Sequence, residues 1–136
     1  MVADPPPAAD KPAGGEPMIG RLRVSSTKQD ERFLSVVQGA DSGAAADVAT
    51  AIASKSGTAY AGALVKGTAV LFPVTLGTFA AVTFDVPATT TKFLVTGLVP
   101  AASYDVAITT PVAGTTEVVV QPGTAKQADS GGVLSF

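Results

Sequence analysis

Apolar and polar residues alternate along most of the chain after residue 18, which is the pattern of β-strands with one buried face. In residues 80–86, Val82, Phe84 and Val86 share one face and alternate with the polar side chains of Thr83 and Asp85. Pro87 then ends the strand, because proline donates no hydrogen bond to a neighbouring strand. Further strands are predicted over residues 19–24, 32–38, 47–55, 58–65, 68–74, 116–121 and 133–136, with others around 93–98 and 104–108.

Turns that contain glycine separate these strands at intervals of about ten residues. Ser56–Gly57 and Lys66–Gly67 are expected to be hairpin tips, because glycine supplies the positive φ of two-residue loops. Residues 44–54 are rich in alanine and would also suit a short helix, but we expect a strand from Asp47 to Lys55. About nine or ten short strands indicate an all-β fold, an antiparallel β-sandwich of the immunoglobulin or fibronectin III kind, with an up-and-down β-barrel as the alternative.

A tyrosine corner is predicted at Leu98, Pro100 and Tyr104, where a strand begins. In this motif the phenol folds back over the turn, and its hydroxyl bonds a nearby backbone group. Because the corner belongs to the crossing between two sheets, it favours the sandwich over the barrel. Residues expected to point into the core are Tyr104, Val106, Ile108, Phe33, Phe72, Phe84 and Phe93.

Residues 1–17 mix proline, alanine, glycine and a few charges without periodicity, so we expect a disordered linker there. Residues 18–136 then form a single domain, since a chain of 136 residues has room for one core and a tail. A linker tethers a domain to something else, and the expected partner is the remainder of the domain's own parent protein. We expect the domain to be a monomer.

The composition removes most kinds of chemistry from consideration. The chain has no histidine and no cysteine, so it lacks an imidazole base, a thiolate nucleophile and soft metal ligands. A net charge of −2 provides no field for phosphates, which argues against a nucleic-acid partner. No apolar run approaches the roughly 20 residues of a membrane span, and the first residues do not resemble a signal peptide. We therefore predict no enzyme activity, cofactor, metal or membrane insertion.

The aromatic residues Tyr60 and Phe79 are the candidate glycan contacts, because sugars stack on aromatic rings and both residues adjoin predicted turns. Packing in the core is the plainer interpretation for both. The chain has no tryptophan, the usual platform for a sugar ring.

Acidic side chains offer two further hypotheses. Asp41, Asp47 and Asp129 lie in predicted loops, but their spacing lacks the dense oxygen ligands of a calcium site, and solvated turns explain them better. Asp85 and Asp105 would be a carboxylate pair for glycoside hydrolysis only if they faced each other. Both alternate with inward residues, so we expect them to face water on separate strands.

Two resemblances to known families follow from these residues. Residues 98–106 resemble the passage between strands E and F of fibronectin type III and related immunoglobulin-like sandwiches. Residues 19–24, 30–38 and 67–72 resemble the C-terminal β-sandwich module of heparinase II/III-like polysaccharide lyases. In that module a phrase of the kind R-F-L-H-V-L-Q follows a strand with arginines, and here Arg32 to Gln38 reads R-F-L-S-V-V-Q.

The resemblance to the lyases implies a function without catalysis. Their chemistry lies in a helical toroid and a larger β-domain and uses tyrosine and histidine, whereas this chain has no histidine. The chain would therefore be a noncatalytic accessory module that packs against or spaces the rest of a secreted bacterial polysaccharide-degrading enzyme. The resemblance also implies an extracellular or periplasmic location. The alternatives are a carbohydrate-binding module, with polysaccharide as its partner, and an adhesin or surface-protein repeat.

Overall fold

The computed structural model describes residues 2–4, 21–27, 33–39, 41 and 43–136, and the chain divides into two compact units, Met1–Phe33 and Leu34–Phe136. In the first unit, β1 (Val2–Asp4) pairs antiparallel with β2 (Arg21–Arg23). β1 lies in the stretch expected to be a disordered linker, and residues 2–4 form a strand there because β2 supplies a partner. Residues 5–17 lie outside the described residues.

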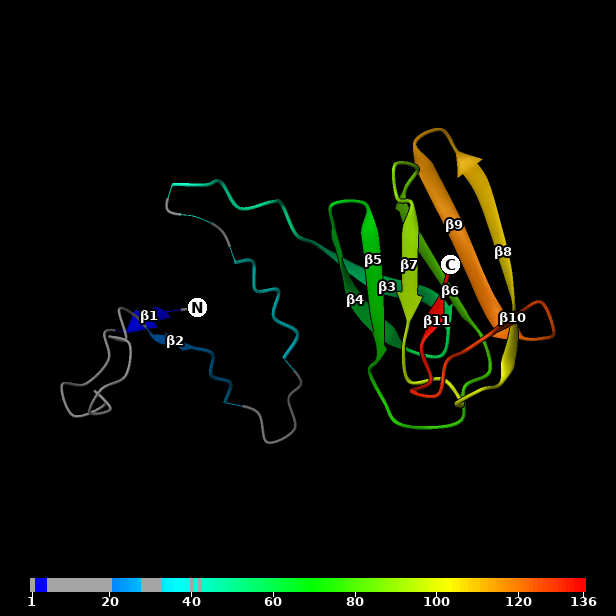
Figure 1. Cartoon of the computed structure of the whole chain (residues 1–136). Coiled ribbons are helices and arrows are strands. Elements are labelled where there is room, and N and C mark those ends of the chain that lie inside the picture. Colours follow the sequence, from blue (N-terminus) through cyan, green and yellow to red (C-terminus); the bar gives the residue numbers. More distant parts are fainter. Residues whose placement is uncertain (1, 5–20, 28–32, 40, 42) are drawn as a thin grey trace. The chain divides into compact units, whose positions relative to one another are not determined.

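The second unit contains a nine-stranded sheet in the order β10-β8-β9-β6-β3-β4-β5-β7-β11 (Figure 1). The described residues form strands and turns and contain no helix, so the prediction of an all-β fold is confirmed. The strands are β3 (Thr50–Gly57), β4 (Tyr60–Val65), β5 (Thr68–Pro73), β6 (Val82–Pro87), β7 (Lys92–Val95), β8 (Ser103–Val112), β9 (Thr115–Pro122), β10 (Lys126–Gln127) and β11 (Leu134–Ser135).

Strand β3 belongs to two halves of this sheet. Its residues 50–53 pair with β4, and Ser54, Ser56 and Gly57 pair with β6, with an irregularity in register between Ser54 and Ser56. We call the half with β4, β5, β7 and β11 the β4–β5 layer, and the half with β6, β9, β8 and β10 the β6–β9 layer. The pairing of β5 with β7 is parallel, so the sheet is mixed and not purely antiparallel as expected.

Side chains from both layers form one core. Leu71 and Val95 come from the β4–β5 layer, Phe84 and Val118 come from the β6–β9 layer, and all four are fully buried. Phe93 is also buried, so two of the four phenylalanines expected in the core are found there. The interior is apolar, which is the condition for stability of a domain without disulfides.

Three residues expected in the core are exposed instead. Phe72 is 43% exposed, because Leu71 takes the inward position of β5 and successive side chains of a strand point to opposite faces. Phe33 is 55% exposed, and residues 33–38 form no strand although one was predicted there. Ile108 is 53% exposed, because the side chains of β8 become more exposed as the strand runs away from the core.

The predicted hairpin tip at Lys66–Gly67 is present, but the one predicted at Ser56–Gly57 is not. Ser56 and Gly57 pair with Thr83 and Val82 of β6, and β3 pairs with β4 only as far as Ala53, opposite Ala61. Lys66 and Gly67 join β4 to β5 with φ values of 48° and 72°, which two-residue turns between antiparallel strands require. The β3–β4 connection runs through residues 58–59, just after the predicted tip. At Gly57, φ is 83° and a Cβ atom would lie 2.2 Å from the carbonyl oxygen of Ala81, so glycine is required there.

Candidate functional site

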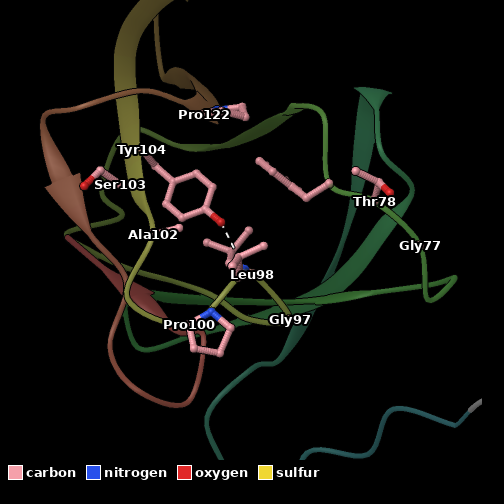
Figure 2. Close-up of a pocket in the computed structure, with 11 residues that line it drawn as sticks. Gly77, Thr78, Gly97, Leu98, Pro100, Ala102, Ser103, Tyr104 and Pro122 are labelled. Atoms are coloured by element: carbon pink, nitrogen blue, oxygen red, sulfur yellow. Dashed lines mark hydrogen bonds between the residues drawn. The ribbon is translucent and has the colours of Figure 1, made fainter.

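The structure places Leu98, Pro100 and Tyr104 in one turn, with the tyrosine side chain folded back over it (Figure 2). The backbone N–H of Val99 donates to the Tyr104 hydroxyl at 3.0 Å. Leu98 and Tyr104 are both buried, whereas Pro100 is exposed. This hydrogen bond closes the turn between β7 and β8, so the role of Tyr104 here is to stabilise the fold.

The C-terminal loop fixes the same turn from the other side. The backbone N–H of Leu98 donates to the Gly132 carbonyl oxygen at 3.0 Å, and that of Ala101 donates to the Asp129 carbonyl oxygen at 3.1 Å. One carboxylate oxygen of Asp129 accepts from the N–H groups of Gly131 and Val133, both at 2.8 Å. Asp129 is therefore committed to a loop, which agrees with its interpretation as a turn residue.

The two candidate glycan contacts pack in a row of rings. The ring centroid of Phe79 lies 6.1 Å from that of Tyr60 and 5.6 Å from that of Tyr104, edge to face in both cases. Tyr60 is only 2% exposed, and its hydroxyl donates to the Thr96 carbonyl oxygen at 3.0 Å. A buried ring has no free face for a sugar, so Tyr60 is removed from the candidates. Phe79 remains half-buried.

Burial also changes the acidity of Tyr60. Loss of water around the phenol, with a smaller contribution from nearby Tyr104, raises the pKa of Tyr60 to about 12. The side chain is therefore neutral at physiological pH and acts as a hydrogen-bond donor.

Phe79 lines an open depression of about 550 Å³ at one end of the domain (Figure 2). Thr78 and Ser103 contribute hydroxyls to its wall, and Val99, Pro100 and Pro122 contribute apolar surface. The depression contains no carboxylate and no cation, so it offers shape and apolar contact but no acid–base chemistry.

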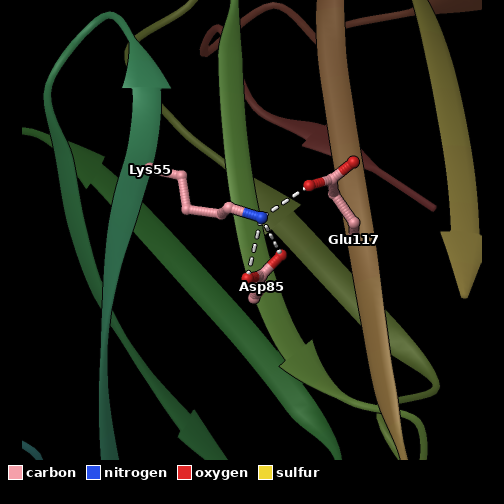
Figure 3. A network of polar contacts seen from close by, with 3 residues as sticks. All are labelled: Lys55, Asp85 and Glu117. Carbon is pink, nitrogen blue, oxygen red and sulfur yellow. Dashed lines mark hydrogen bonds and ion pairs between the residues drawn. The ribbon is translucent and has the colours of Figure 1, made fainter. Parts of the chain in front are cut away.

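Lys55 connects two carboxylates on the outer face of the β6–β9 layer (Figure 3). Its Nζ lies 3.0 Å from an Asp85 oxygen and 2.6 Å from a Glu117 oxygen. Asp85 and Glu117 are directly opposite each other on β6 and β9. Hydrogen bonds to Glu117, and then to Asp85, raise the pKa of Lys55, so this lysine stays charged and cannot be a neutral base near pH 7.

The carboxylates considered for hydrolysis lie in separate networks. Asp85 is held by Lys55, whereas one oxygen of Asp105 accepts from the backbone N–H groups of Thr124 at 2.9 Å and Ala125 at 3.0 Å. Neither carboxylate faces the other across a cleft. The described part of the chain holds no group of three potential metal-ligating side chains, and no helix there is long and apolar enough to cross a bilayer.

The outer face of the β4–β5 layer differs from the charged face around Lys55 because most of its side chains are apolar, although the strand pairings also place Thr68, Lys92 and Ser135 on it. Phe72 lies beside Ala61, and Val70 lies beside Ala63 on one side and Leu94 on the other. None of these side chains is buried in the core. We call this surface the apolar face and define it by Ala51, Ala53, Ala61, Ala63, Val65, Val70, Phe72 and Leu94, which the strand pairings place on one side of the layer.

A segment without strand pairing, residues 34–38, lies over part of the apolar face, and we call it the strap. Leu34 and Val36 of the strap line an apolar groove of about 260 Å³ together with Val65, Val70 and Phe72. Leu34 and Val36 of the strap are themselves about half exposed, and Val37 is almost fully exposed. The strap therefore enlarges the apolar surface and does not cover it completely.

Polar contacts hold the end of the strap in place. The Gln38 side-chain nitrogen donates to the Asp47 carbonyl oxygen at 2.7 Å, and the Gln38 side-chain oxygen accepts from the Asp47 N–H at 2.9 Å. The Asp47 carboxylate lies 2.9 Å from Lys66 Nζ at the β4–β5 turn. The hydrogen bond to Asp47 raises the pKa of Lys66, and Asp47 is used in an ion pair at the edge of the layer.

Alternation along the sequence did not reveal the apolar face. One signal for it exists: residues 61–65 and 68–72 are mostly apolar at both odd and even positions, as in strands covered on both sides. The Lys55 network had no sequence signal, because its members are 30 and 62 positions apart. No family model, curated protein or solved structure matches this chain.

Proposed function

We propose that this chain is a noncatalytic β-sandwich module that packs against another domain of its parent protein through the apolar face. The single observation that supports this proposal is the apolar outer surface of the β4–β5 layer, enlarged by the strap. Soluble monomers seldom expose contiguous apolar patches of this kind, and such patches often mark sites of contact with other proteins.

The rest of the described surface supports a packing role over catalysis. On the other layer Lys55 is paired with Asp85 and Glu117, and the carboxylates of Asp105 and Asp129 accept hydrogen bonds from the backbone. The Phe72 ring is large, rigid and partly exposed, which suits it to anchor a contact between domains.

The identity of the parent protein is a further part of this proposal. The resemblance of residues 30–38 and 67–72 to heparinase II/III-like lyases favours a secreted bacterial polysaccharide-degrading enzyme. These same two segments supply the strap and strand β5. In such an enzyme the module would orient or stabilise the catalytic part.

Because the chain has no cysteine, single cysteines can test the contact directly. Phe72→Cys places a thiol on the apolar face, and Ala107→Cys places a matched thiol on the outer face of the β6–β9 layer. We expect a maleimide to react about tenfold or more slowly at position 72 in the full-length gene product than in this chain alone, with no such change at position 107. Equal rates at position 72 in the two proteins would overturn the proposal.

A carbohydrate-binding module is the second candidate, and the half-buried Phe79 in the open depression is the observation that favours it. Titration with an acidic polysaccharide, followed by NMR or calorimetry, separates the two functions. A packing module shows no saturable response. A binding module shows one that Phe79→Ala abolishes while Phe72→Ala leaves it unchanged.

A further inference from the structure

Strand β8 has an open edge that the domain does not cover. One side of β8 pairs with β9 along most of its length, but the other side pairs with β10 only at Ser103 and Tyr104. Beyond Tyr104, no strand in the described part of the chain lies on that side, and Figure 1 shows β8 as the outermost strand of its layer above β10. Edges of this kind are templates for an additional strand.

The hydrogen bonds around the start of β8 show which backbone groups face the open edge. Ser103 accepts from Gly123, after β9, at 3.1 Å, and Ala102 accepts from Ala128, after β10, at 2.9 Å. Backbone groups alternate between the two sides of a regular strand, so those of Val106 and Ile108 face the open side, up to the irregularity that begins after Thr109. The open edge is therefore a regular row of donors and acceptors.

The side chains along this edge carry no protection against pairing. Natural edge strands are guarded by lysines, prolines or bulges, yet Val106 to Thr110 contains no charged residue and no proline. A bulge and Pro111 come only after Thr109, at the end of the row. Ile108 lies in its middle and is 53% exposed.

We propose that a second copy of this chain pairs antiparallel with the β8 edge about a two-fold axis at Ile108. This axis places Ile108 opposite Ile108, where about two new backbone hydrogen bonds form, and brings Val106 opposite Thr110, where the irregularity of β8 ends the regular row. The exposed Ile108 side chain is then covered by its own image. Residues 106–110 carry no charged side chain that would favour a strand of opposite charge from another protein. For the same reason, pairing between two copies brings no like charges together.

This inference goes beyond the proposed packing function and uses a different surface. The apolar face lies on the β4–β5 layer, whereas the β8 edge ends the β6–β9 layer. It also differs from the expectation of a monomer, because sequence alternation predicts the strand but not the absence of a neighbour on one side of it.

Sedimentation equilibrium over a range of protein concentrations tests the proposal. We expect the native chain to form dimers and Ile108→Lys to remain monomeric, because two lysines directly opposite each other at the axis would repel. Leu76→Lys is the matched control, since Leu76 is 85% exposed and lies in a loop outside β8; this variant should dimerise like the native chain. Thr110→Lys repeats the test should Ile108→Lys fail to fold, which circular dichroism would reveal.

Amide hydrogen exchange gives an independent measurement. The amides of Val106 and Ile108 should exchange more slowly as the concentration of the native chain rises, and should show no such dependence in the monomeric variant. A native chain that is monomeric at all concentrations would overturn the proposal. So would a dimer that Phe72→Lys disrupts and Ile108→Lys does not, because that dimer would use the apolar face.

Discussion

The outer faces of the two layers are built on the same backbone pattern but differ in chemistry. On the β6–β9 layer, Lys55 lies between Asp85 and Glu117, and every charge of this group has an opposite charge beside it. On the β4–β5 layer, Phe72 and Val70 lie among alanines and form an apolar surface. A sheet face in contact with water needs polar groups. The difference therefore indicates that the outer face of the β6–β9 layer is suited to solvent, whereas the apolar face is suited to contact with a partner.

This comparison also shows that burial in a core and apolar composition are separate properties. Both layers send valine, leucine and phenylalanine inward, and these residues hold the domain together. Only the β4–β5 layer is apolar on its second face as well. The outward residues of that layer can therefore be changed with small effects on folding, whereas its inward residues cannot.

The largest expected effect comes from disturbing the layer that carries the apolar face. A Cβ atom at Gly62 would lie 2.0 Å from the carbonyl oxygen of Val70, so Gly62→Ala forces β4 and β5 apart. We expect the free energy of unfolding to fall by about 3 kcal/mol, measured by chemical denaturation. Ala61→Ser, on the outward side of the same strand, is the control and should change stability by about 0.5 kcal/mol or less. A stable Gly62→Ala variant would show that this close approach is absent.

The pH dependence of stability should report the buried phenol of the same layer. Tyr60 has a folded-state pKa of about 12 and an ordinary value of 10.0, so the unfolded chain loses its proton first. The stabilisation is complete below pH 10 and is lost as the pH rises from 10 to 12, by about 2 kcal/mol in total. Absorbance of the phenolate during a pH titration measures this pKa, and Tyr60→Phe should remove the late-titrating step. Titration of every phenol near pH 10 in the folded protein would contradict the burial.

A third prediction compares this tyrosine with the one in the opposite layer. Tyr104→Phe leaves the backbone N–H of Val99 without its partner, and we expect a loss of about 1–2 kcal/mol in the free energy of unfolding. The ring stays in place, so the circular dichroism spectrum should not change. Thermal and chemical denaturation measure the loss, and an unchanged stability would mean that water replaces the hydroxyl without cost.

The smallest effect is expected on the charged face. The informative result there is whether added salt raises or lowers the stability of the variant. Lys55→Met leaves Asp85 and Glu117 opposite each other without a cation. Like charges across a strand pair repel, and salt screens that repulsion, so added salt should stabilise the variant. Lys66→Met is the control, because Lys66 serves the single carboxylate of Asp47. Thermal denaturation at several salt concentrations should show the stabilising trend for Lys55→Met alone.

Local features of the fold were predictable from the sequence. The hairpin at Lys66–Gly67 depends on two adjacent residues, and residues 82–87 form a strand where alternation places one. The turn between Leu98 and Tyr104 depends on a spacing of a few residues. In each case the interactions that determine the local structure lie within one turn or one strand, so the local sequence is enough to predict it.

Features that depend on distant partners were not predictable. In β5 both Leu71 and Phe72 are apolar, and only the position of the other layer decides which of them is buried. Residues 33–38 have the composition of a strand, but a strand needs a neighbour, and none pairs with them in the described part of the chain. For the same reason the sequence left two interpretations of Tyr60, core packing and glycan contact; its hydroxyl bonds Thr96, which is 36 positions away, and the side chain is in the interior.

Strand β3 is the one element that both layers share, with its first half bonded to β4 and its second half to β6. Neither half of the sandwich can therefore assemble fully as an independent folding unit. We expect the domain to unfold in a single cooperative transition, because melting either layer removes the pairing partner of β3 on that side and weakens the other. The change of partners between Ala53 and Ser54, which the irregularity between Ser54 and Ser56 follows, is then the point through which the loss of one layer destabilises the whole domain.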